Sequence, residues 1–275
     1  MKKLVNRVLS KFGFILMRVV KQRDSQNTGS DNPFKEYDLP RGYEAVQLVT
    51  NFSMLPHINL FTLYEQAAYC EKNNIEGDYV ECGVWKGGAV GVMAKANLDF
   101  GKQRRNLRLF DVFDNICPPD AAVDGERAIV DTMKITGFMD ESKMKGQLES
   151  MDGAYDLYGG HGTIEICKDL LENKIGYPAE YVHFHKGWFQ DTIPASLAEI
   201  DKIAILRLDG DWYASVKVCL ENLYDKVSPG GLVIIDDYGL YEGCTKAVDE
   251  FLQGRNIKTF LSYSRVHCRY FVKQG

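Results

Sequence analysis

The sequence lacks the features that mark membrane-spanning, nucleic-acid-binding and disulfide-rich proteins. The basic N-terminus has no long apolar run, because its longest uncharged stretch is Phe12 to Met17, far too short to span a bilayer. Acidic residues outnumber basic ones, and the formal net charge of −5 argues against binding a phosphate backbone. We therefore predict no nucleic-acid partner. The seven cysteines are scattered without a CxxC pair, as expected for reduced thiols in a cytoplasmic protein.

Two common nucleotide-binding fingerprints are also missing. Neither GxGxxG nor GxxxxGK[ST] occurs in the sequence. The first absence disfavours a nicotinamide-dependent oxidoreductase, and the second excludes the common phosphate-binding loop.

The N-terminal part differs in character from the rest of the chain. Residues 1–21 interleave lysine and arginine with apolar side chains and show no small-residue cleavage site. Two interpretations stay open: a basic amphipathic helix resting on an anionic membrane or a partner protein, or a helix packed on the main domain. Residues 22–41 are polar, with glycine and proline, and indicate a linker or an arm. We therefore predict an N-terminal segment over residues 1–41 and a catalytic domain over residues 42–275.

Beyond residue 60, apolar runs typical of strands alternate with helical stretches. Near-continuous apolar strands separated by helices predict an α/β fold, with a mostly parallel sheet covered by helices on both faces. A helix is expected over Ala89–Leu98, and the final two strands would form a terminal pair. The predicted strands are Asp78–Cys82, Asn106–Phe110, Tyr181–His185, Ile203–Leu208, Leu232–Ile235, Lys258–Phe260 and Cys268–Val272.

An irregular stretch around residues 118–177 interrupts this alternation. It contains Pro118-Pro119, charged segments and the sequence GGHG at residues 159–162. Two interpretations are open: a lid-like insertion over an active site, or an insertion that only adds surface.

A glycine-rich turn follows the first predicted strand. Its sequence ECGVWKGG begins at Glu81 and opens a helix, so glycine backbone and unpaired N–H groups can approach a ligand closely. Asp111 ends the next strand, where a carboxylate can accept hydrogen bonds from both ribose hydroxyls of an adenosine cofactor. Glu81 suits the ammonium group of S-adenosylmethionine and would repel a pyrophosphate. The alternative is a turn needed only for tight strand–helix packing.

Four aspartates end two later strands. Asp209 and Asp211 follow Ile203–Leu208, and Asp236 and Asp237 follow Leu232–Ile235. Neighbouring parallel strands lie about 4.8 Å apart, so these carboxylates would converge and repel unless a cation neutralises them. Hard oxygen ligands favour magnesium, with calcium or manganese as alternatives. The competing interpretation is that some of these aspartates cap helices.

Taken together, the motifs resemble the macrocin O-methyltransferase family over roughly residues 43–272. The segment FSMLPHINLFTLYE, at residues 52–65, is also similar to the family's sequence before the first strand. The five motifs that carry the resemblance are YVECGVWKGGA (79–89), LFDVFDN (109–115), KGWFQDTIP (186–194), LRLDGDWYAS (206–215) and VSPGGLVIIDDYG (227–239).

The resemblance implies a Rossmann-like class I methyltransferase fold with a seven-stranded sheet, S-adenosylmethionine and Mg²⁺. Asp209 matches a metal ligand that is also a proposed general base; His161 and His185 are fallback bases, because histidine titrates near neutral pH. The other matching residues are Asp236 and Asp237 as metal ligands and Met54, Glu81, Gly83 and Asp111 as cofactor-binding residues.

The predicted function is metal-dependent O-methylation of a hydroxyl on a sugar or a glycosylated natural product. The alternatives are a phenolic acceptor and a non-catalytic protein that binds S-adenosylmethionine or associates with a membrane. We expect a small-molecule acceptor, a homo-oligomer and a cytoplasmic location. Contact of residues 1–21 with the inner membrane face would make the enzyme peripheral.

Overall fold

The computed structural model describes residues 40–137, 140–141, 144–264 and 267–275. Arg41–Gly275 forms one compact unit, separate from Met1–Pro40. The predicted amphipathic helix over residues 1–21 lies outside the described residues, and so does the polar arm apart from its last two residues. The boundary at residues 41–42 stays a prediction. No helix in the described part of the chain is long and apolar enough to cross a membrane.

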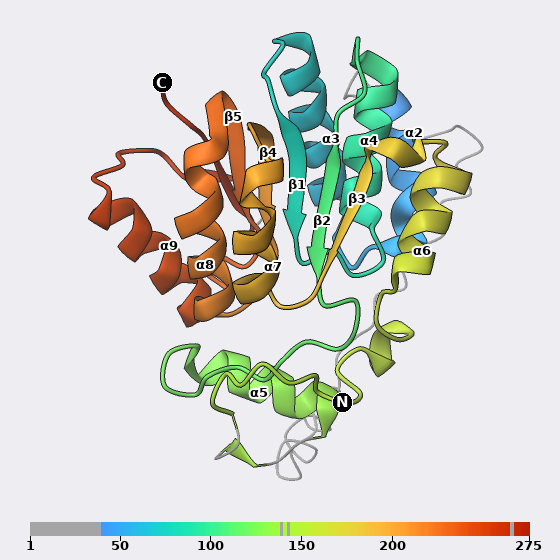
Figure 1. Cartoon of the computed structure of the whole chain (residues 1–275). Coiled ribbons are helices and arrows are strands. Elements are labelled where there is room, and N and C mark those ends of the chain that lie inside the picture. Colours follow the sequence, from blue (N-terminus) through green and yellow to red (C-terminus); the bar gives the residue numbers. More distant parts are fainter. Residues whose placement is uncertain (1–39, 138–139, 142–143, 265–266) are drawn as a thin grey trace, which may run out of the picture. The chain divides into compact units, whose positions relative to one another are not determined.

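A seven-stranded sheet forms the centre of the unit, in the order β3-β2-β1-β4-β5-β7-β6 (Figure 1). Strands β1 to β5 run parallel, and β7 pairs antiparallel with both β5 and β6. The strands are β1 Asp78–Cys82, β2 Leu107–Asp111, β3 Val182–Lys186, β4 Ile203–Leu208, β5 Val227–Ile235, β6 Ser262–Tyr263 and β7 Arg269–Val272.

The predicted mostly parallel sheet is confirmed, with local differences in the bounds of several strands. Strands β2 and β3 are each shifted one residue from the predicted position. Strand β5 begins at Val227, because Val227 pairs with Ile203 although Ser-Pro-Gly-Gly follows it. The first strand of the terminal pair is Ser262–Tyr263 rather than Lys258–Phe260.

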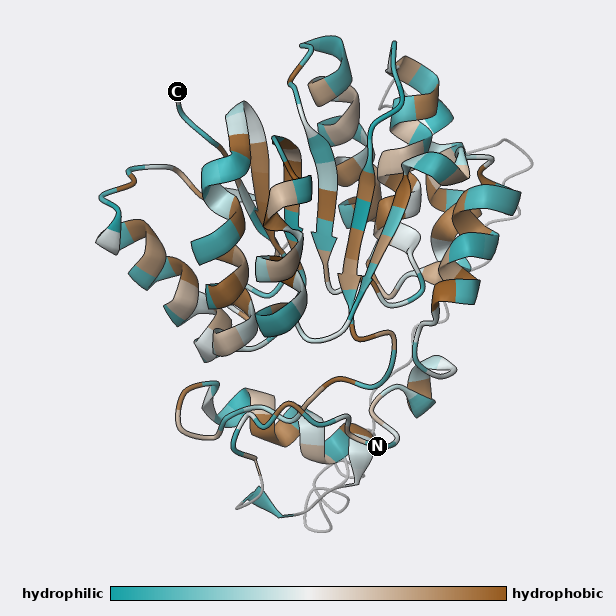
Figure 2. Cartoon of the chain, viewed as in Figure 1, coloured by the Kyte–Doolittle hydropathy of each residue, from teal (hydrophilic) through white to brown (hydrophobic). Residues whose placement is uncertain are grey.

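Helices cover both faces of the sheet, as Figure 1 shows. The α-helices are α2 Pro40–Val49, α3 His57–Lys72, α4 Gly88–Phe100, α5 Gly125–Thr136, α6 Ile164–Lys168, α7 Phe189–Ser196, α8 Tyr213–Leu223 and α9 Glu242–Gly254. The short helices are η2 Thr50–Phe52, η4 Asp156–Tyr158, η5 Asp169–Lys174, η6 Ala179–Tyr181, η7 Leu197–Glu199 and η8 Tyr224–Lys226. Apolar colour concentrates in the strands and polar colour on the outer sides of the helices (Figure 2).

The alternation of side chains along the strands decides which groups reach the site. Val80 and Cys82 of β1 point into the core formed with helices α7, α8 and α9. Successive side chains of a strand point to opposite faces, so Glu81 lies on the face that carries α3 and α4. Glu81 and Arg207 are register partners on β1 and β4, which places two charged side chains next to each other in the sheet.

The irregular stretch between β2 and β3 contains α5, η4, α6 and η5. Figure 1 shows α5 beyond the carboxyl ends of the strands. Two contacts tie the start of this stretch to α8: Trp212 Nε1 donates to the Cys117 carbonyl oxygen at 3.0 Å, and Asp124 accepts from the Tyr213 amide at 2.7 Å. The insertion is therefore anchored next to the strand ends.

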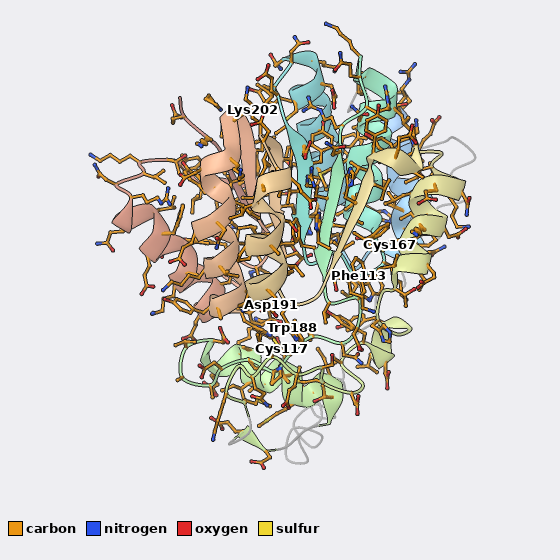
Figure 3. The ribbon with its side chains drawn as sticks, viewed as in Figure 1. Phe113, Cys117, Cys167, Trp188, Asp191 and Lys202 are labelled. Atoms are coloured by element: carbon orange, nitrogen blue, oxygen red, sulfur yellow. The ribbon has the colours of Figure 1, made fainter. Side chains whose placement is uncertain are left out.

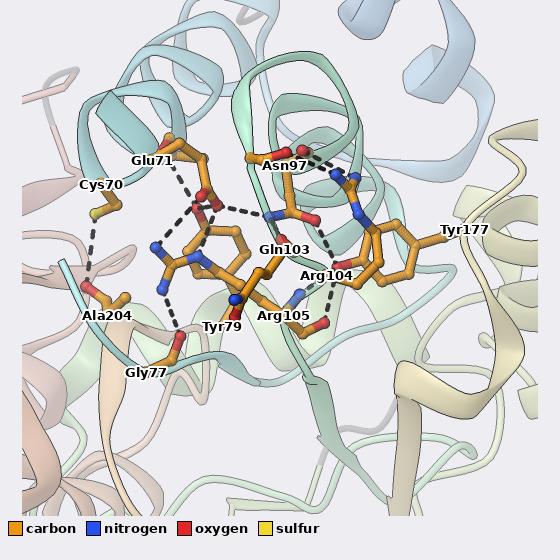
Figure 4. Close-up of polar contacts among 12 residues, drawn as sticks. Cys70, Glu71, Gly77, Tyr79, Asn97, Gln103, Arg104, Arg105, Tyr177 and Ala204 are labelled. Carbon is orange, nitrogen blue, oxygen red and sulfur yellow. Dashed lines mark hydrogen bonds and ion pairs between the residues drawn. The ribbon is translucent and has the colours of Figure 1, made fainter. Parts of the chain in front are cut away.

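At the opposite end of the strands, a buried polar network joins α3, α4 and the sheet (Figure 4). Glu71 accepts from Tyr79 Oη at 2.5 Å, Asn97 Nδ2 at 2.8 Å and Arg105 Nε at 2.6 Å. Tyr177 Oη donates to Asn97 Oδ1 at 2.9 Å, and it also contacts the Arg105 backbone. One glutamate faces one arginine, and every partner in this network is hydrogen-bonded.

Candidate active site

The glycine-rich turn after β1 brings the ends of β1 and β4 into close contact. Gly83 has φ +89°, and a Cβ at this position would lie 1.8 Å from the Asp209 carbonyl oxygen. Any other residue would force the two strand ends apart. Gly87, also left-handed at φ +88°, precedes α4, and its missing side chain leaves the first turn of that helix without a side-chain cap.

Asp111, at the end of β2, holds this turn in place. Its carboxylate accepts from the amides of Val84 at 2.6 Å, Trp85 at 3.0 Å and Phe113 at 2.7 Å. Burial raises the pKa of Asp111, and these backbone hydrogen bonds oppose the rise. A carboxylate has about four acceptor positions, so one is left for a ligand.

Arg207 is the buried cation at the centre of the site, with 2% of its surface exposed. It donates to Glu81, to Asp209 Oδ2 at 2.8 Å and to Asp236 Oδ1 at 2.8 Å. Burial raises the pKa of Glu81 to about 8, against the opposing attraction of Arg207. The sequence analysis missed Arg207, although a lone charge within the apolar run IAILRL was a signal for it.

Three aspartates form the group best placed to hold a metal ion. Ligand oxygens of Asp209, Asp211 and Asp237 all lie within 4.8 Å of one another. Burial and the neighbouring carboxylates raise the pKa of both Asp211 and Asp237 well above the ordinary value. Among the described residues, Asp237 Oδ2 is buried without a hydrogen-bond partner. The donor set therefore fits a hard divalent cation.

The metal ligands predicted from the sequence were Asp209, Asp236 and Asp237. The structure brings Asp209 and Asp237 together, and Arg207 donates to one oxygen of Asp236 as it does to one oxygen of Asp209. Burial, then Asp209, raises the pKa of Asp236 to about 6. Asp211, in a left-handed conformation at φ +53°, takes the third place in the group.

Three cavities meet around these residues. The largest, of about 410 Å³, is lined by Glu81, Arg207 and the strand-end aspartates, and we call it the Glu81 cavity. Two smaller ones, of about 180 and 60 Å³, are lined by Gly83 and Asp111. Asp209 and Asp211 line all three, and Met54 lines the two larger ones. The predicted cofactor residues therefore line neighbouring cavities, with Glu81 on the largest and Asp111 on the two smaller ones.

The Glu81 cavity contains most of the unpartnered buried polar atoms. Among the described residues, six buried side-chain nitrogen or oxygen atoms have no hydrogen-bond partner. Four of the six belong to residues that line this cavity: Asn59 Oδ1, Glu81 Oε2, Asp237 Oδ2 and His267 Nδ1. Sequence reasoning identified neither Asn59 nor His267, because only the folded chain brings the start of α3 and the β6–β7 turn to the strand ends.

The fallback bases His161 and His185 line none of the three cavities. The ring of His185 stacks on Phe110 at 4.1 Å, and its Nδ1 lies 2.8 Å from Ser196 Oγ. Burial lowers the pKa of His185 to about 4. These contacts give His185 a packing role beside β2.

The insertion contacts the glycine-rich turn directly. Trp85 Nε1 donates to the Gly160 carbonyl oxygen at 3.2 Å, and Lys86 Nζ donates to that of Gly159 at 2.9 Å. Tyr155 lines both smaller cavities. Figure 3 labels Cys117 and Trp188 between the carboxyl ends of the strands and α5, and Lys202 at the other end of the strands.

Comparison with known proteins assigns the family. The model of the Macrocin-O-methyltransferase (TylF) family matches residues 14–152 and 168–273. The match confirms the resemblance seen in the five sequence motifs. The unmatched gap includes Tyr155, Gly159 and Gly160, the part of the insertion that contacts the glycine-rich turn.

Individual relatives support the same assignment. The chain is 37% identical over 179 residues to demethyldecarbamoylnovobiocin O-methyltransferase of Streptomyces niveus; the match spans 65% of this chain and 59% of the relative. It is 32% identical, with the same coverage, to the 8-demethyl-8-(2,3-dimethoxy-alpha-L-rhamnosyl)-tetracenomycin-C 4'-O-methyltransferase of Streptomyces olivaceus. The solved structure of the O-methyltransferase NovP is similar with a TM-score of 0.63 and 31% identity, over 82% of this chain and 83% of that one. The predicted Rossmann-like class I fold is thereby confirmed.

Proposed function

Because the chain belongs to the macrocin O-methyltransferase family, we propose that it is an S-adenosylmethionine-dependent, divalent-metal-dependent O-methyltransferase. Its acceptor is a hydroxyl of a sugar or of a glycosylated natural product. One observation carries the proposal: Asp209, Asp211 and Asp237 converge at the strand ends beside a glycine-rich turn and line neighbouring cavities.

The donor site extends from Asp111 to Glu81. Asp111 keeps one acceptor position for a ribose hydroxyl, and the small cavity beside it is lined by Trp188 and Phe189, apolar rings suited to an adenine. Glu81 faces the large cavity with an unpartnered oxygen, which suits the ammonium group of the methionine part. Met54 lies between the two larger cavities, where the sulfonium would be held.

The metal would be held by Asp209 and Asp237, with Asp211 as the third ligand in the geometry and Asp236 as the ligand that the family pattern adds. When bound, the cation supplies positive charge that lowers the pKa of an acceptor hydroxyl. Among the ion pairs of the described residues, Arg207 is the only basic partner of this group of acids, and it already neutralises parts of Asp209, Asp236 and Glu81.

The reaction is an in-line displacement. The acceptor oxygen forms a bond to the methyl carbon while the carbon–sulfur bond breaks, so S-adenosylhomocysteine leaves and the hydroxyl proton passes to a carboxylate. Asp209 is the proton acceptor that the resemblance implies. Asp211 is the alternative, because Arg207 donates to Asp209 and to no oxygen of Asp211 among the described contacts. Alignment of donor and acceptor supplies much of the rate.

The acceptor would enter the cavity of about 180 Å³ that the insertion helps to line. Its walls include Trp212 and Tyr241, whose ring centroids are 5.1 Å apart, together with Tyr155 and Asp131. Aromatic faces pack against the apolar face of a sugar ring, and a carboxylate accepts hydrogen bonds from its hydroxyls. The names of the novobiocin and tetracenomycin relatives agree with this class of acceptor. A phenol is the second candidate.

The proposal is tested by transfer of a labelled methyl group from S-adenosylmethionine to a panel of glycosylated natural products and phenols, with and without EDTA. We expect product with at least one glycosylated acceptor, a loss on chelation that Mg²⁺ restores, and a loss of at least about 100-fold in Asp209→Asn. Full activity after chelation would contradict the metal requirement. No binding of S-adenosylmethionine would contradict the enzyme class and leave a different ligand-binding role.

We also propose a homo-oligomer and a cytoplasmic location, the latter supported by seven buried cysteines without a disulfide. Light scattering after size exclusion tests the oligomer, with a monomeric mass as the contrary result. Membrane contact through residues 1–21 rests on their basic composition alone. Liposome co-sedimentation that is unchanged by deleting those residues would reject it.

A further inference from the structure

The Glu81 cavity offers acceptor atoms that no residue of the described chain satisfies. Asn59 is 8% exposed, Glu81 1% and Asp237 6%, and each has one buried oxygen without a hydrogen-bond partner among the described residues. Buried polar atoms are nearly always satisfied in folded proteins, and an unsatisfied one is costly. Several in one cavity indicate a bound group that donates hydrogen bonds.

The position of Asn59 separates it from the proposed metal site. Its side chain comes from the first turn of α3, whereas the metal group comes from the ends of β4 and β5. Glu81, on the same side of the sheet as α3, is not a member of the aspartate group whose ligand atoms lie within 4.8 Å. Arg207 occupies only one oxygen of Glu81. A neutral amide oxygen and a half-neutralised carboxylate suit an ammonium better than a divalent ion.

The same cavity offers a matching place for a carboxylate. Gly88 and Ala89, the first residues of α4, line it, and no side chain caps this thirteen-residue helix. The first N–H groups of a helix bind anions. Acceptors on one wall and helix N–H groups on another match the two charges of an α-amino acid.

We propose that Asn59 is a specificity-determining residue that binds the ammonium of the amino-acid end of S-adenosylmethionine, together with Glu81. The inference rests on the proposed function, and it adds a neutral side chain from α3 to the donor site. Asn59 then distinguishes ligands that carry the amino-acid end from adenosine thioethers that lack it.

The test compares two ligands by titration calorimetry on the full chain. S-adenosylhomocysteine carries the amino-acid end, and 5′-methylthioadenosine lacks it. We expect Asn59→Leu to weaken the affinity for S-adenosylhomocysteine about ten-fold, as for loss of a hydrogen bond to a charged group. The affinity for methylthioadenosine should change less than two-fold. Asn59→Asp keeps a hydrogen-bond acceptor, so its affinity for S-adenosylhomocysteine should stay within about three-fold of the wild-type value.

Gln66→Leu is the matched control. Gln66 lies on the same helix, is 8% exposed like Asn59, and has a buried unpartnered Nε2, but it does not line the cavity. It should leave the affinities for both ligands unchanged. If Asn59→Leu does not fold, Asn59→Ala tests the same loss.

Three outcomes would overturn the inference. They are an equal loss for both ligands in Asn59→Leu, no loss for either, and the same selective loss in Gln66→Leu. Wild-type chain that binds methylthioadenosine but shows no preference for S-adenosylhomocysteine would also overturn it while leaving the proposed function standing. Wild-type chain that binds neither ligand would overturn both.

Discussion

Two arginines at opposite ends of the same sheet, Arg105 partly buried and Arg207 fully buried, illustrate how structure and function divide the polar groups of this chain. Arg105 and Glu71 form one pair of opposite charges, and Tyr79, Asn97 and Tyr177 complete their hydrogen bonds (Figure 4). Each of these five side chains has a hydrogen-bond partner within the cluster. The cluster therefore holds α3 and α4 to the strands.

Arg207, by contrast, faces more acids than it can neutralise. It contacts Glu81, Asp209 and Asp236, while Asp211 and Asp237 lie close by without a cation among the described residues. Folding alone does not favour such an excess of buried carboxylates. The difference teaches that a saturated buried network indicates a structural role, whereas an unbalanced one indicates a site that a ligand completes.

Removing the cation of the unbalanced cluster should have the largest effect on stability. Arg207→Met leaves three carboxylates without their partner, so we expect the free energy of unfolding to fall by about 3–5 kcal/mol. Urea denaturation in EDTA at pH 7 measures this. Adding Glu81→Gln should recover part of the loss, and a loss below about 1 kcal/mol in the single variant would show that Arg207 does not neutralise the cluster.

Breaking the balanced cluster should cost less stability and no ligand affinity. Glu71→Gln leaves the partly buried Arg105 without its counter-charge, with an expected loss of about 2 kcal/mol. Urea denaturation gives the loss, and titration calorimetry should give an unchanged affinity for S-adenosylhomocysteine. A marked loss of affinity would mean that the two ends of the sheet are coupled and that the comparison fails.

Neutralising a surplus carboxylate should act in the opposite direction. In EDTA, Asp237→Asn removes the repulsion between Asp237 and a neighbouring carboxylate. We expect it to stabilise the chain by about 1 kcal/mol, the energy of two like charges about 4 Å apart in water. Added Mg²⁺ should then raise the thermal unfolding temperature of the wild type and not that of the variant, because a ligand stabilises only a protein that binds it. Destabilisation in EDTA would contradict the assignment of Asp237 to an unbalanced site.

A pH-dependent effect is expected at His185, which belongs to neither cluster. Its pKa falls from 6.5 to about 4 on folding, so between these values the unfolded chain binds a proton that the folded chain does not. Stability from this group is therefore complete above pH 6.5 and is lost as the pH falls toward 4. The buried carboxylates titrate in the opposite sense, so the difference between variants is the informative quantity. His185→Phe should show a smaller shift of the urea midpoint from pH 7 to pH 5; an identical shift would count against burial of a neutral ring.

The fold was predictable largely because the central strands are nearly continuous apolar runs. The strands Asp78–Cys82 and Ile203–Leu208 lie where they were expected. The start of β5 was not predictable, because Pro229-Gly230-Gly231 has the composition of a turn while Val227 already pairs with Ile203.

The site was predictable in part. Aspartates at the ends of parallel strands must converge, and they do. Which aspartates form the close group was not predictable, because it depends on the contact of Arg207 with Asp236 and on the left-handed backbone at Asp211. Asn59 was not predicted as a site residue for a similar reason, because its position in the sequence of α3 does not determine which cavity the start of the helix lines.

The central claim is that the unbalanced end of the sheet is a site for the methyl donor. Titration calorimetry of the full chain with S-adenosylhomocysteine in the presence of Mg²⁺ tests it most directly. The account predicts saturable binding of one molecule per chain with a micromolar dissociation constant, retained in Glu71→Gln. Absence of binding to the folded wild type, or binding that survives a bulky substitution such as Gly83→Val at the junction of β1 and β4, would contradict it.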